Sequence, residues 1–571
     1  MLFNNGIEDE FRGCGGSGVH LACQPCLPEA EWGEQHVLGV CPMMKRCLSR
    51  SVPADTAALG QNLLAVTDIY RQIGDRFDEL IPAEDIFSPM YSYKGMGAVS
   101  PLLLALVTIL QMMEKLPDRV AARYVVTRLD WKYALHLPLG YLGFHFTDLH
   151  AFRQRLLEHG QERLVFDQVV ARLKAMGLIK KRGKMRTDAT HVVALINRLS
   201  QLELVRESMR VALDAVTDVA PAWVGETVPA DFSETYGERR NDYRLSDAQI
   251  AKQLLQAGRD GFWFLAQIEH SAPVEARGLP KVGVLRTVLA QQFPQGPESG
   301  PAKDRPAGRG VIETPHDPEA RGSKKRHKSW VGHKSHITET CDEGLPSLIT
   351  DVEVTDATEG DNDQLPEIQK RLAERGMQPG EQLVDQAYMS GENLARSAEQ
   401  GIDLVGRPEQ DHGAPEGYRQ ADFQIDEEKK EAICPAGQKS VVWSASPVGD
   451  GERCRIEIRF ARLRCQACRA FGVCTKSTQG RSLALNPYRD LLEPYRARAK
   501  TEEFKQEFRL RSQIEGSISE LVRGYGARDA RYRGRAKNRL QACFTATAAN
   551  LKRTIRWSLQ RERCASEAVA A

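Results

Sequence analysis

Apolar residues recur with two different periods along this chain, and the change of period predicts where helices and strands lie. Between residues 51 and 180 a spacing of three to four residues predicts several short helices, one of which begins at Ser100-Pro101. GKMRTDATHV then predicts a short strand, and a long amphipathic helical region runs on to about Gln292. Proline and glycine crowd the next stretch, FPQGPESGPAKDRPAGRG, which we expect to be a linker or surface loop.

Strand patterns appear after this linker. SWVGHKSHITET and LPSLITDVEVTDA predict two strands, while EQLVDQAYMS and IDLVGRP predict two shorter ones with helices before and between them. Residues 408–487 are polar, turn-rich and cysteine-bearing, and a basic helical segment follows from Pro494 to about Leu559. Strands followed by a strand–helix–strand unit indicate an α+β protein with a mixed sheet flanked by helices.

These patterns predict five segments, in keeping with roughly 100–200 residues per domain. They are a leader rich in cysteine and glycine at 1–50, a helical domain at 51–180, the first part of the sheet domain at 181–407 with a helical insertion and linker at about 195–322, a Cys-bearing insertion at 408–487, and the second part of the sheet domain at 488–560. The helices of 51–180 suit either a helix-turn-helix DNA binder or a plain helical bundle.

Composition excludes some classes of protein. The chain has 42% hydrophobic and 27% charged residues, which is typical of a globular protein. Its most apolar stretch, near Ser100, is too short to cross a bilayer, and the first residues do not form a signal peptide. We therefore expect a cytoplasmic protein whose 13 cysteines are mostly reduced. The net charge of +2 hides an uneven distribution, because residues 489–563 hold 19 Lys and Arg against 9 Asp and Glu.

Chemistry-bearing motifs narrow the choice to carboxylates. The chain has no Walker A loop, no GxGxxG, no HExxH and no GxSxG, which removes the commoner nucleotide-binding and hydrolase classes. Asp188 lies at the end of a predicted strand, where it is either a site residue or the N-cap of a following helix. Asp385 follows the buried Leu383-Val384 and is either a site residue or the start of an Asx-turn.

Glu515 lies in an amphipathic helical pattern. A wheel of about 100° per residue that starts at Phe504 places Glu515 near 20°, inside the apolar face, with Arg511 beside it. A buried carboxylate is costly unless it is paired or binds a cation. The wheel leaves two interpretations open: a structural Arg511–Glu515 pair, or a metal ligand oriented by the arginine.

Cysteines in the insertion have metal-ligand spacing. Cys434, Cys465, Cys468 and Cys474 form C-x30-C-x2-C-x5-C, which predicts either a structural Zn²⁺ site or free buried thiols, with Cys454 as a rival ligand. Cys23, Cys26, Cys41 and Cys47 in the leader are a second candidate zinc set, although a poorly ordered leader is favoured.

Four stretches together resemble a known family. They are MRTDATHV, HDPEARGSKKRHKSWVGHKSHITETCD, LVDQAYMSGENL, and RSQIEGSISELVRGYGARDARYRGRAKNRLQ followed by Asn550-Leu551-Lys552-Arg553. In this order they resemble the bacterial insertion-sequence transposases of the DDE class, which have an RNase H-like catalytic domain. The resemblance extends from about residue 90 to residue 556.

This resemblance implies a function and a set of catalytic residues. Asp188, Asp385 and Glu515 would form the catalytic triad and bind two Mg²⁺ (or Mn²⁺) ions, with Asp188 bridging both. The protein would bind double-stranded DNA at terminal inverted repeats and at a target, cleave it and transfer strands, as a homodimer in the synaptic complex and associated with the nucleoid. The rival hypothesis is a catalytically silent DNA-binding protein derived from a transposase.

Two further sets of residues belong to this hypothesis. The chain departs from the family's glutamate signature at Phe508 and at Val522, where the neighbouring Arg523 would supply the phosphate contact. Asp356, Asp361 and Asp363 are nearby acids that we expect in a solvated loop and helix cap. The residues expected to contact DNA are basic: Lys324, Lys325, Arg326, Lys328, Lys334, Arg511, Arg523, Arg528, Arg531, Arg533, Arg535 and Lys537.

Overall fold

The structure is a computed structural model of the whole chain. It describes residues 48–92, 97–195, 199–237, 245–303, 306, 308–325, 328–408, 415–448 and 453–570. The leader up to residue 47, with its four candidate zinc ligands, lies outside these residues, as does Arg326. Across the described ranges, no helix has both the length and the apolarity needed to cross a membrane.

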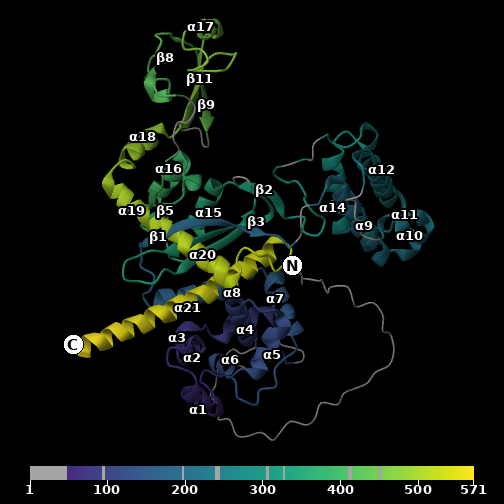
Figure 1. Cartoon of the computed structure of the whole chain (residues 1–571), viewed down its shortest axis with the longest axis vertical. Helices are drawn as coiled ribbons and strands as arrows, with labels where there is room; N and C mark the ends of the chain where they lie inside the picture. Colours follow the sequence, from purple (N-terminus) through teal and green to yellow (C-terminus); the bar gives the residue numbers. More distant parts are fainter. Residues whose placement is uncertain are drawn as a thin grey trace. The chain divides into compact units, whose positions relative to one another are not determined.

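A mixed six-stranded sheet forms the centre of the fold (Figure 1). Its strands are β1 (Lys184–Val193), β2 (Arg321–Lys325), β3 (Lys328–Thr340), β4 (Ile349–Asp356), β5 (Glu381–Val384) and β6 (Asp403–Val405). β3 lies antiparallel between β1 and β4, and its first residues also pair with β2. On the other side β1 pairs in parallel with β5, and β5 with β6. The α+β prediction is confirmed, and the order β4-β3-β1-β5-β6 is consistent with an RNase H-like fold.

Short helices precede the sheet, as the hydrophobic period predicts. They are α1 (Ala54–Leu63), α2 (Ile69–Asp75), α3 (Phe77–Leu80), η2 (Glu84–Met90), α4 (Pro101–Glu114), α5 (Asp118–Thr127), α6 (Leu129–Ala134), α7 (Thr147–Glu158) and α8 (Leu164–Ala175). The Ser100 hydroxyl caps α4 by accepting from Leu103 N at 3.1 Å. All residues of α4 from Pro101 to Met112 are buried.

The four C-terminal helices are α18 (Arg489–Arg498), α19 (Glu502–Ser512), α20 (Ile514–Tyr525) and α21 (Arg535–Ala570). α21 packs against α4, α8 and β4. One hydrophobic core therefore runs without interruption through the N-terminal helices, the sheet and the C-terminal helices. The helical segment predicted from Pro494 begins earlier and has three breaks, over 499–501, at Gln513 and over 526–534.

A helical insertion lies between β1 and β2 and has a hydrophobic core of its own. Its helices are α9 (Gln201–Val219), α10 (Pro221–Thr227), α11 (Ala230–Tyr236), α12 (Asp247–Ser271), α13 (Val274–Arg277), α14 (Pro280–Gln292) and η3 (Pro297–Ser299). Capping boxes at Ser200 and Ser246 begin the two longest helices. The long amphipathic region predicted to Gln292 is thus confirmed as several helices.

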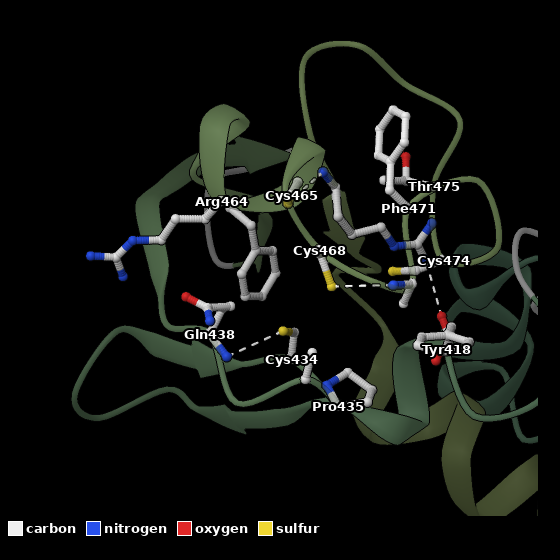
Figure 2. Close-up of a pocket in the computed structure, with 14 residues that line it drawn as sticks. Tyr418, Cys434, Pro435, Gln438, Arg464, Cys465, Cys468, Phe471, Cys474 and Thr475 are labelled. Atoms are coloured by element: carbon white, nitrogen blue, oxygen red, sulfur yellow. Dashed lines mark hydrogen bonds between the residues drawn. The ribbon is translucent and has the colours of Figure 1, made fainter.

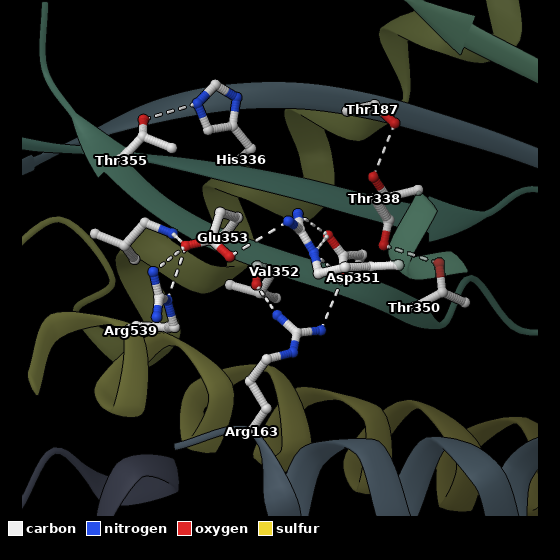
Figure 3. A network of polar contacts seen from close by, with 12 residues as sticks. Arg163, Thr187, His336, Thr338, Thr350, Asp351, Val352, Glu353, Thr355 and Arg539 are labelled. Atoms are coloured by element: carbon white, nitrogen blue, oxygen red, sulfur yellow. Dashed lines mark hydrogen bonds and ion pairs between the residues drawn. The ribbon is translucent and has the colours of Figure 1, made fainter. Parts of the chain in front are cut away.

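Charged residues on β4 join the sheet to the helices that flank it (Figure 3). The fully buried Asp351 is paired with Arg163, Arg371 and Arg375 at 2.7–2.8 Å, and Glu353 with Arg539 at 2.7 Å. These arginines belong to the start of α8, to α15 (Asp361–Glu374) and its end, and to α21. Buried ions lose hydration, so each such carboxylate requires this degree of pairing.

The Cys-bearing insertion contains strands that we do not predict from its polar sequence. Its elements are η5 (Gln420–Asp422), β7 (Gln424–Asp426), β8 (Glu431–Ile433), β9 (Ser440–Val448), β10 (Arg453–Phe460), α17 (Arg462–Gln466) and β11 (Ser482–Leu485). β9, β10 and β11 form one antiparallel sheet, and β7 pairs with β8. Most of β9 is exposed on both faces, which removes the apolar alternation that would reveal it.

Candidate active site

Two of the candidate acids come from neighbouring parallel strands. In the β1–β5 pairing Thr187 lies opposite Val384, so the next residue of each strand, Asp188 and Asp385, lies at the same level of the sheet. Asp188 stands in the middle of β1, and its Oδ1 accepts from Ala189 N at 2.7 Å. The expectation that it ends a strand is therefore wrong, and so is the N-cap alternative, because the antiparallel pairing with β3 continues the strand to Val193.

Asp385 lies where we expect it. It follows the last residue of β5, and its carboxylate accepts from Gln386 N at 2.8 Å to begin η4 (Gln386–Tyr388). The turn interpretation and the site interpretation are compatible here, since the same carboxylate also faces Arg511 at 3.5 Å.

The third acid, Glu515, lies in the first turn of α20, and its side chain is 70% exposed. Its predicted place on the apolar face is wrong because the helix does not continue through Gln513. Arg186 Nη1 donates to Leu510 O at 2.9 Å, the carbonyl that Ile514 N would reach in an unbroken helix, and to Gln513 Oε1 at 2.8 Å. A side chain inserted into the hydrogen-bond ladder breaks the helix and ends the continuous wheel.

All three carboxylates meet at the guanidinium of Arg511. Its Nη2 lies 2.8 Å from Asp188 Oδ2 and 3.5 Å from Asp385 Oδ2, and its Nη1 lies 3.7 Å from Glu515 Oε1. Arg511 is 12% exposed, and its buried Nε has no hydrogen-bond partner among the described residues. Residues from β1, β5 and α20, far apart in sequence, thus surround one positive charge.

The donor set suits a hard divalent cation in its chemistry. Three carboxylates offer the oxygen ligands that Mg²⁺ prefers, and exposure of their side chains rises from 16% at Asp188 through 47% at Asp385 to 70% at Glu515. The site is therefore open to solvent on the side of Glu515. In the described part of the chain no group of three or more His, Cys, Asp or Glu side chains is already arranged to hold a metal ion. Here the guanidinium occupies the space between the acids.

A buried ionic cluster supports these elements, and we do not predict it from the sequence. Glu339 on β3 is fully buried, with Arg186 Nε at 2.6 Å from its Oε1 and Arg553 Nη1 at 2.8 Å from its Oε2. Ser517 of α20 donates to the same Oε1 at 2.9 Å. The cluster fastens β1, α20 and α21 to β3. In the sequence this cluster is indicated only by a charged residue, Glu339, at a strand position that faces inward. The alternation of apolar and polar residues does not tell such a buried charge from one on an exposed edge strand.

A buried polar chain lies beneath Asp385. The Tyr388 hydroxyl and His336 Nδ1 are 2.7 Å apart, and His336 Nε2 lies 3.0 Å from Thr355 Oγ1. Burial lowers the pKa of His336 to about 4, and burial together with nearby carboxylates raises the pKa of Tyr388 well above its usual range. Both groups are therefore neutral at pH 7 and position the turn after β5.

The nearby acids Asp356, Asp361 and Asp363 lie in local contacts. Asp356 Oδ1 accepts from Thr358 N at 2.8 Å, and Asp361 pairs with Lys334 Nζ at 2.7 Å. Asp363 is exposed in the first turn of α15. These contacts agree with the expected loop and helix start.

The basic residues divide into two groups by their contacts. Lys324, Arg523, Arg533 and Lys537 are exposed, while Lys334, Arg511, Arg528, Arg531 and Arg535 are partly buried. Arg528 Nε donates to Thr190 Oγ1 at 3.1 Å, and Arg531 contacts the Leu116 carbonyl. The side chains of Lys325 and Lys328 lie outside the described set. The loop before α21 adds to the end of β1, since Val193 N donates to Arg528 O and Ala530 N to Val193 O.

Comparison with known families gives two matches. Residues 433–555 match a family described as Transposase DDE domain, and residues 61–155 match one described as Transposase domain (DUF772). The first range includes Arg511 and Glu515, whereas Asp188 and Asp385 lie outside both. No curated protein matches the chain.

Proposed function

We propose that this chain, two parts of which match transposase domains, acts as an insertion-sequence DDE transposase and that Asp188, Asp385 and Glu515 are its catalytic triad. The observation that carries the proposal is the convergence of three carboxylates from β1, β5 and α20 on one guanidinium. In a strand order consistent with an RNase H-like fold, β1 and β5 bring the two aspartates together, and α20 adds the glutamate.

The three acids have distinct tasks in this proposal. Asp188, the least exposed, lies innermost and would be shared between two metal ions, while Asp385 and Glu515 would each hold one. Two Mg²⁺ or Mn²⁺ ions held there would activate a water or a 3′-hydroxyl and would stabilise the leaving oxygen. The exposure of Glu515 leaves the outer side of the site accessible to a DNA backbone.

Arg511 has a place in this proposal beside the acids. Its positive charge offsets part of the repulsion that three acids at this distance would otherwise produce. With divalent cations bound among the acids, its guanidinium would be available to a DNA phosphate, for which its planar donors are well suited.

DNA contacts of the proposed enzyme come from the exposed basic residues. Arg523, Arg533 and Lys537 lie at the end of α20 and around the start of α21. Lys324 lies on β2. Clusters of this kind neutralise phosphates, which makes binding salt-dependent. We propose that the N-terminal helices recognise the terminal inverted repeats, that a homodimer forms the synaptic complex, and that the protein acts on DNA in the bacterial cytoplasm.

The rival function is a DNA-binding protein that has lost catalysis. All three acids are present and surround the Arg511 guanidinium, which favours an active enzyme over this rival. The decisive experiment incubates the full chain and Mg²⁺ with DNA that carries the ends of the element, beside Asp188→Ala, Asp385→Ala and Glu515→Ala. Asp363→Ala is the matched control, since it removes an exposed acid that lies away from Arg511.

We expect cleavage by the wild type and by Asp363→Ala, and none by the three triad variants, with all five proteins binding the DNA. A wild type that binds these ends and never cuts them establishes the rival function. Cleavage by any triad variant removes that residue from the proposed triad.

A further inference from the structure

Four cysteines of the Cys-bearing insertion line a single small cavity (Figure 2). Cys434 follows β8, Cys465 lies in α17, and Cys468 and Cys474 lie in the turns between α17 and β11. All eight cysteines in the described part of the chain are free thiols. The cavity thus gathers four reduced sulfurs from two separate segments.

Backbone N–H groups point at three of these sulfurs. Gln438 N donates to Cys434 Sγ at 3.3 Å across a tight turn in which Gly437 has φ of +76°. Ala470 N donates to Cys468 Sγ, and Arg481 N to Cys465 Sγ, each at 3.5 Å. Donors aimed at sulfur stabilise the thiolate over the thiol, as the outer partners of metal ligands do.

The insertion has little else to hold it together. Its hydrophobic core consists of Phe423, Ala432, Ile456, Ile458, Phe460, Leu483 and Leu485. Cys434, Cys465 and Cys474 pack against this core as partly buried groups. A unit with so few core residues usually requires a disulfide, a metal or a partner surface for stability.

Two arginines lie beside the four cysteines in the lining of this cavity. Arg464 and Arg481 line the same cavity, and the buried Nε of Arg481 has no hydrogen-bond partner among the described atoms. The rival ligand Cys454 lies on β10 and is not part of this lining.

We propose that Cys434, Cys465, Cys468 and Cys474 bind one structural Zn²⁺ as four thiolates. Four sulfur ligands in tetrahedral arrangement are the set that selects zinc over harder cations. Among the described residues, no three side chains of this kind are already spaced to hold a metal ion. Zinc binding therefore requires the four cysteine side chains to turn inward until the Zn–S distances are about 2.3 Å. Binding releases up to four thiol protons to solvent and changes no oxidation state. The site joins β8 to the turns around α17, and it is independent of the triad.

Metal analysis of the purified full chain tests this site. We expect the wild type to contain one zinc per chain more than Cys434→Ser and more than Cys468→Ser. Cys454→Ser and Cys564→Ser are matched controls and keep the wild-type content, because neither cysteine lines the cavity. Wild-type content in Cys434→Ser, or no zinc in the wild type, overturns the proposal.

A second measurement does not depend on the variants folding. Wild type reconstituted with Co²⁺ should show thiolate-to-cobalt charge-transfer absorption, and a chelator should expose four additional thiols to a thiol reagent. If the spectrum lacks these bands, or if mass spectrometry finds a Cys465–Cys468 disulfide, the four-thiolate site is refuted.

Discussion

At Arg511, a single side chain occupies the space that the proposed metal ions require. Its guanidinium touches one oxygen of each acid, at 2.8, 3.5 and 3.7 Å. The arginine and the proposed metal ions therefore compete for the same carboxylate oxygens. This competition can be measured without any DNA substrate.

We predict that Arg511→Gln binds Mn²⁺ more tightly than the wild type, by several-fold, because removal of the guanidinium frees the carboxylates and restores their mutual repulsion. Free Mn²⁺ measured by electron paramagnetic resonance in a titration gives the affinity. Arg509→Gln, an exposed arginine of the same helix, is the control and should match the wild type. Equal or weaker binding by Arg511→Gln would show that the arginine does not compete.

His336 gives a pH dependence of stability. Its pKa is lowered from 6.5 to about 4 by burial, so the unfolded chain binds a proton at pH values where the native state does not. Stability from this group is full above pH 6.5 and falls as the pH drops towards 4. The charged groups that act on it are Asp361, Lys334, Arg371 and Asp351.

We predict that the wild type loses up to about 3 kcal/mol more than His336→Gln between pH 6.5 and pH 4. Urea unfolding of both proteins across this range measures the difference, which cancels the other groups that titrate. Parallel pH profiles for the two proteins would mean that His336 is protonated as readily in the folded as in the unfolded chain.

At the scale of elements, the helix that carries Glu515 is placed by the cluster around Glu339. This carboxylate contacts Arg186 of β1, Arg553 of α21 and Ser517 of α20. Arg186 in turn holds the break between α19 and α20 through Leu510 O. The orientation of the catalytic glutamate in the proposed triad therefore depends on a fully buried acid of another strand.

We predict that Glu339→Gln lowers the free energy of unfolding by about 3–5 kcal/mol, since two guanidiniums are then left without their common anion in a buried place. Glu457→Gln removes the carboxylate of the exposed Arg459–Glu457 ion pair on β10 and should lower the free energy of unfolding by less than about 1 kcal/mol. Chemical unfolding followed by circular dichroism makes the comparison. Equal effects of the two changes would deny the cluster a structural role.

The sequence predicts those elements whose apolar residues recur at the spacing of a helix or a strand. The strands β1 and β3 to β6 and the helices between them are visible as hydrophobic patterns, and the resemblance places all three acids. The apolar face assigned to Glu515 fails because a guanidinium from β1 breaks the helix, which is a tertiary contact. The exposed strand β9 and the ion pairs of Asp351 and Glu339 are invisible for the same reason: their stability comes from partners far away in the chain.

At the scale of the whole molecule, the net charge is close to zero, but the C-terminal part is strongly basic. The exposed Arg523, Arg533 and Lys537 belong to this part, while Arg528 and Arg531 are engaged in contacts with β1 and the N-terminal helices. DNA binding should depend on the first group more than on the second.

We predict that replacing Arg533 and Lys537 together by Gln weakens DNA binding. The plot of the logarithm of the binding constant against the logarithm of the salt concentration should become less steep, by roughly 0.9 for each phosphate that the protein no longer neutralises. Titrations of fluorescent DNA at several salt concentrations give the slope. Arg286→Gln, an exposed arginine of α14 in the helical insertion, should leave it unchanged. An unaltered slope in the double variant would place the DNA elsewhere.

The helix α4, which is buried from Pro101 to Met112, has a consequence for how the protein is made. Its apolar residues are covered in part by α21, which the ribosome synthesises long after α4. Until then the nascent chain carries an uncovered apolar surface, and Glu515 has not yet joined Asp188 and Asp385. A polypeptide cut short before α21 therefore leaves apolar surface of α4 uncovered, and the proposed triad is complete only in chains translated beyond α20.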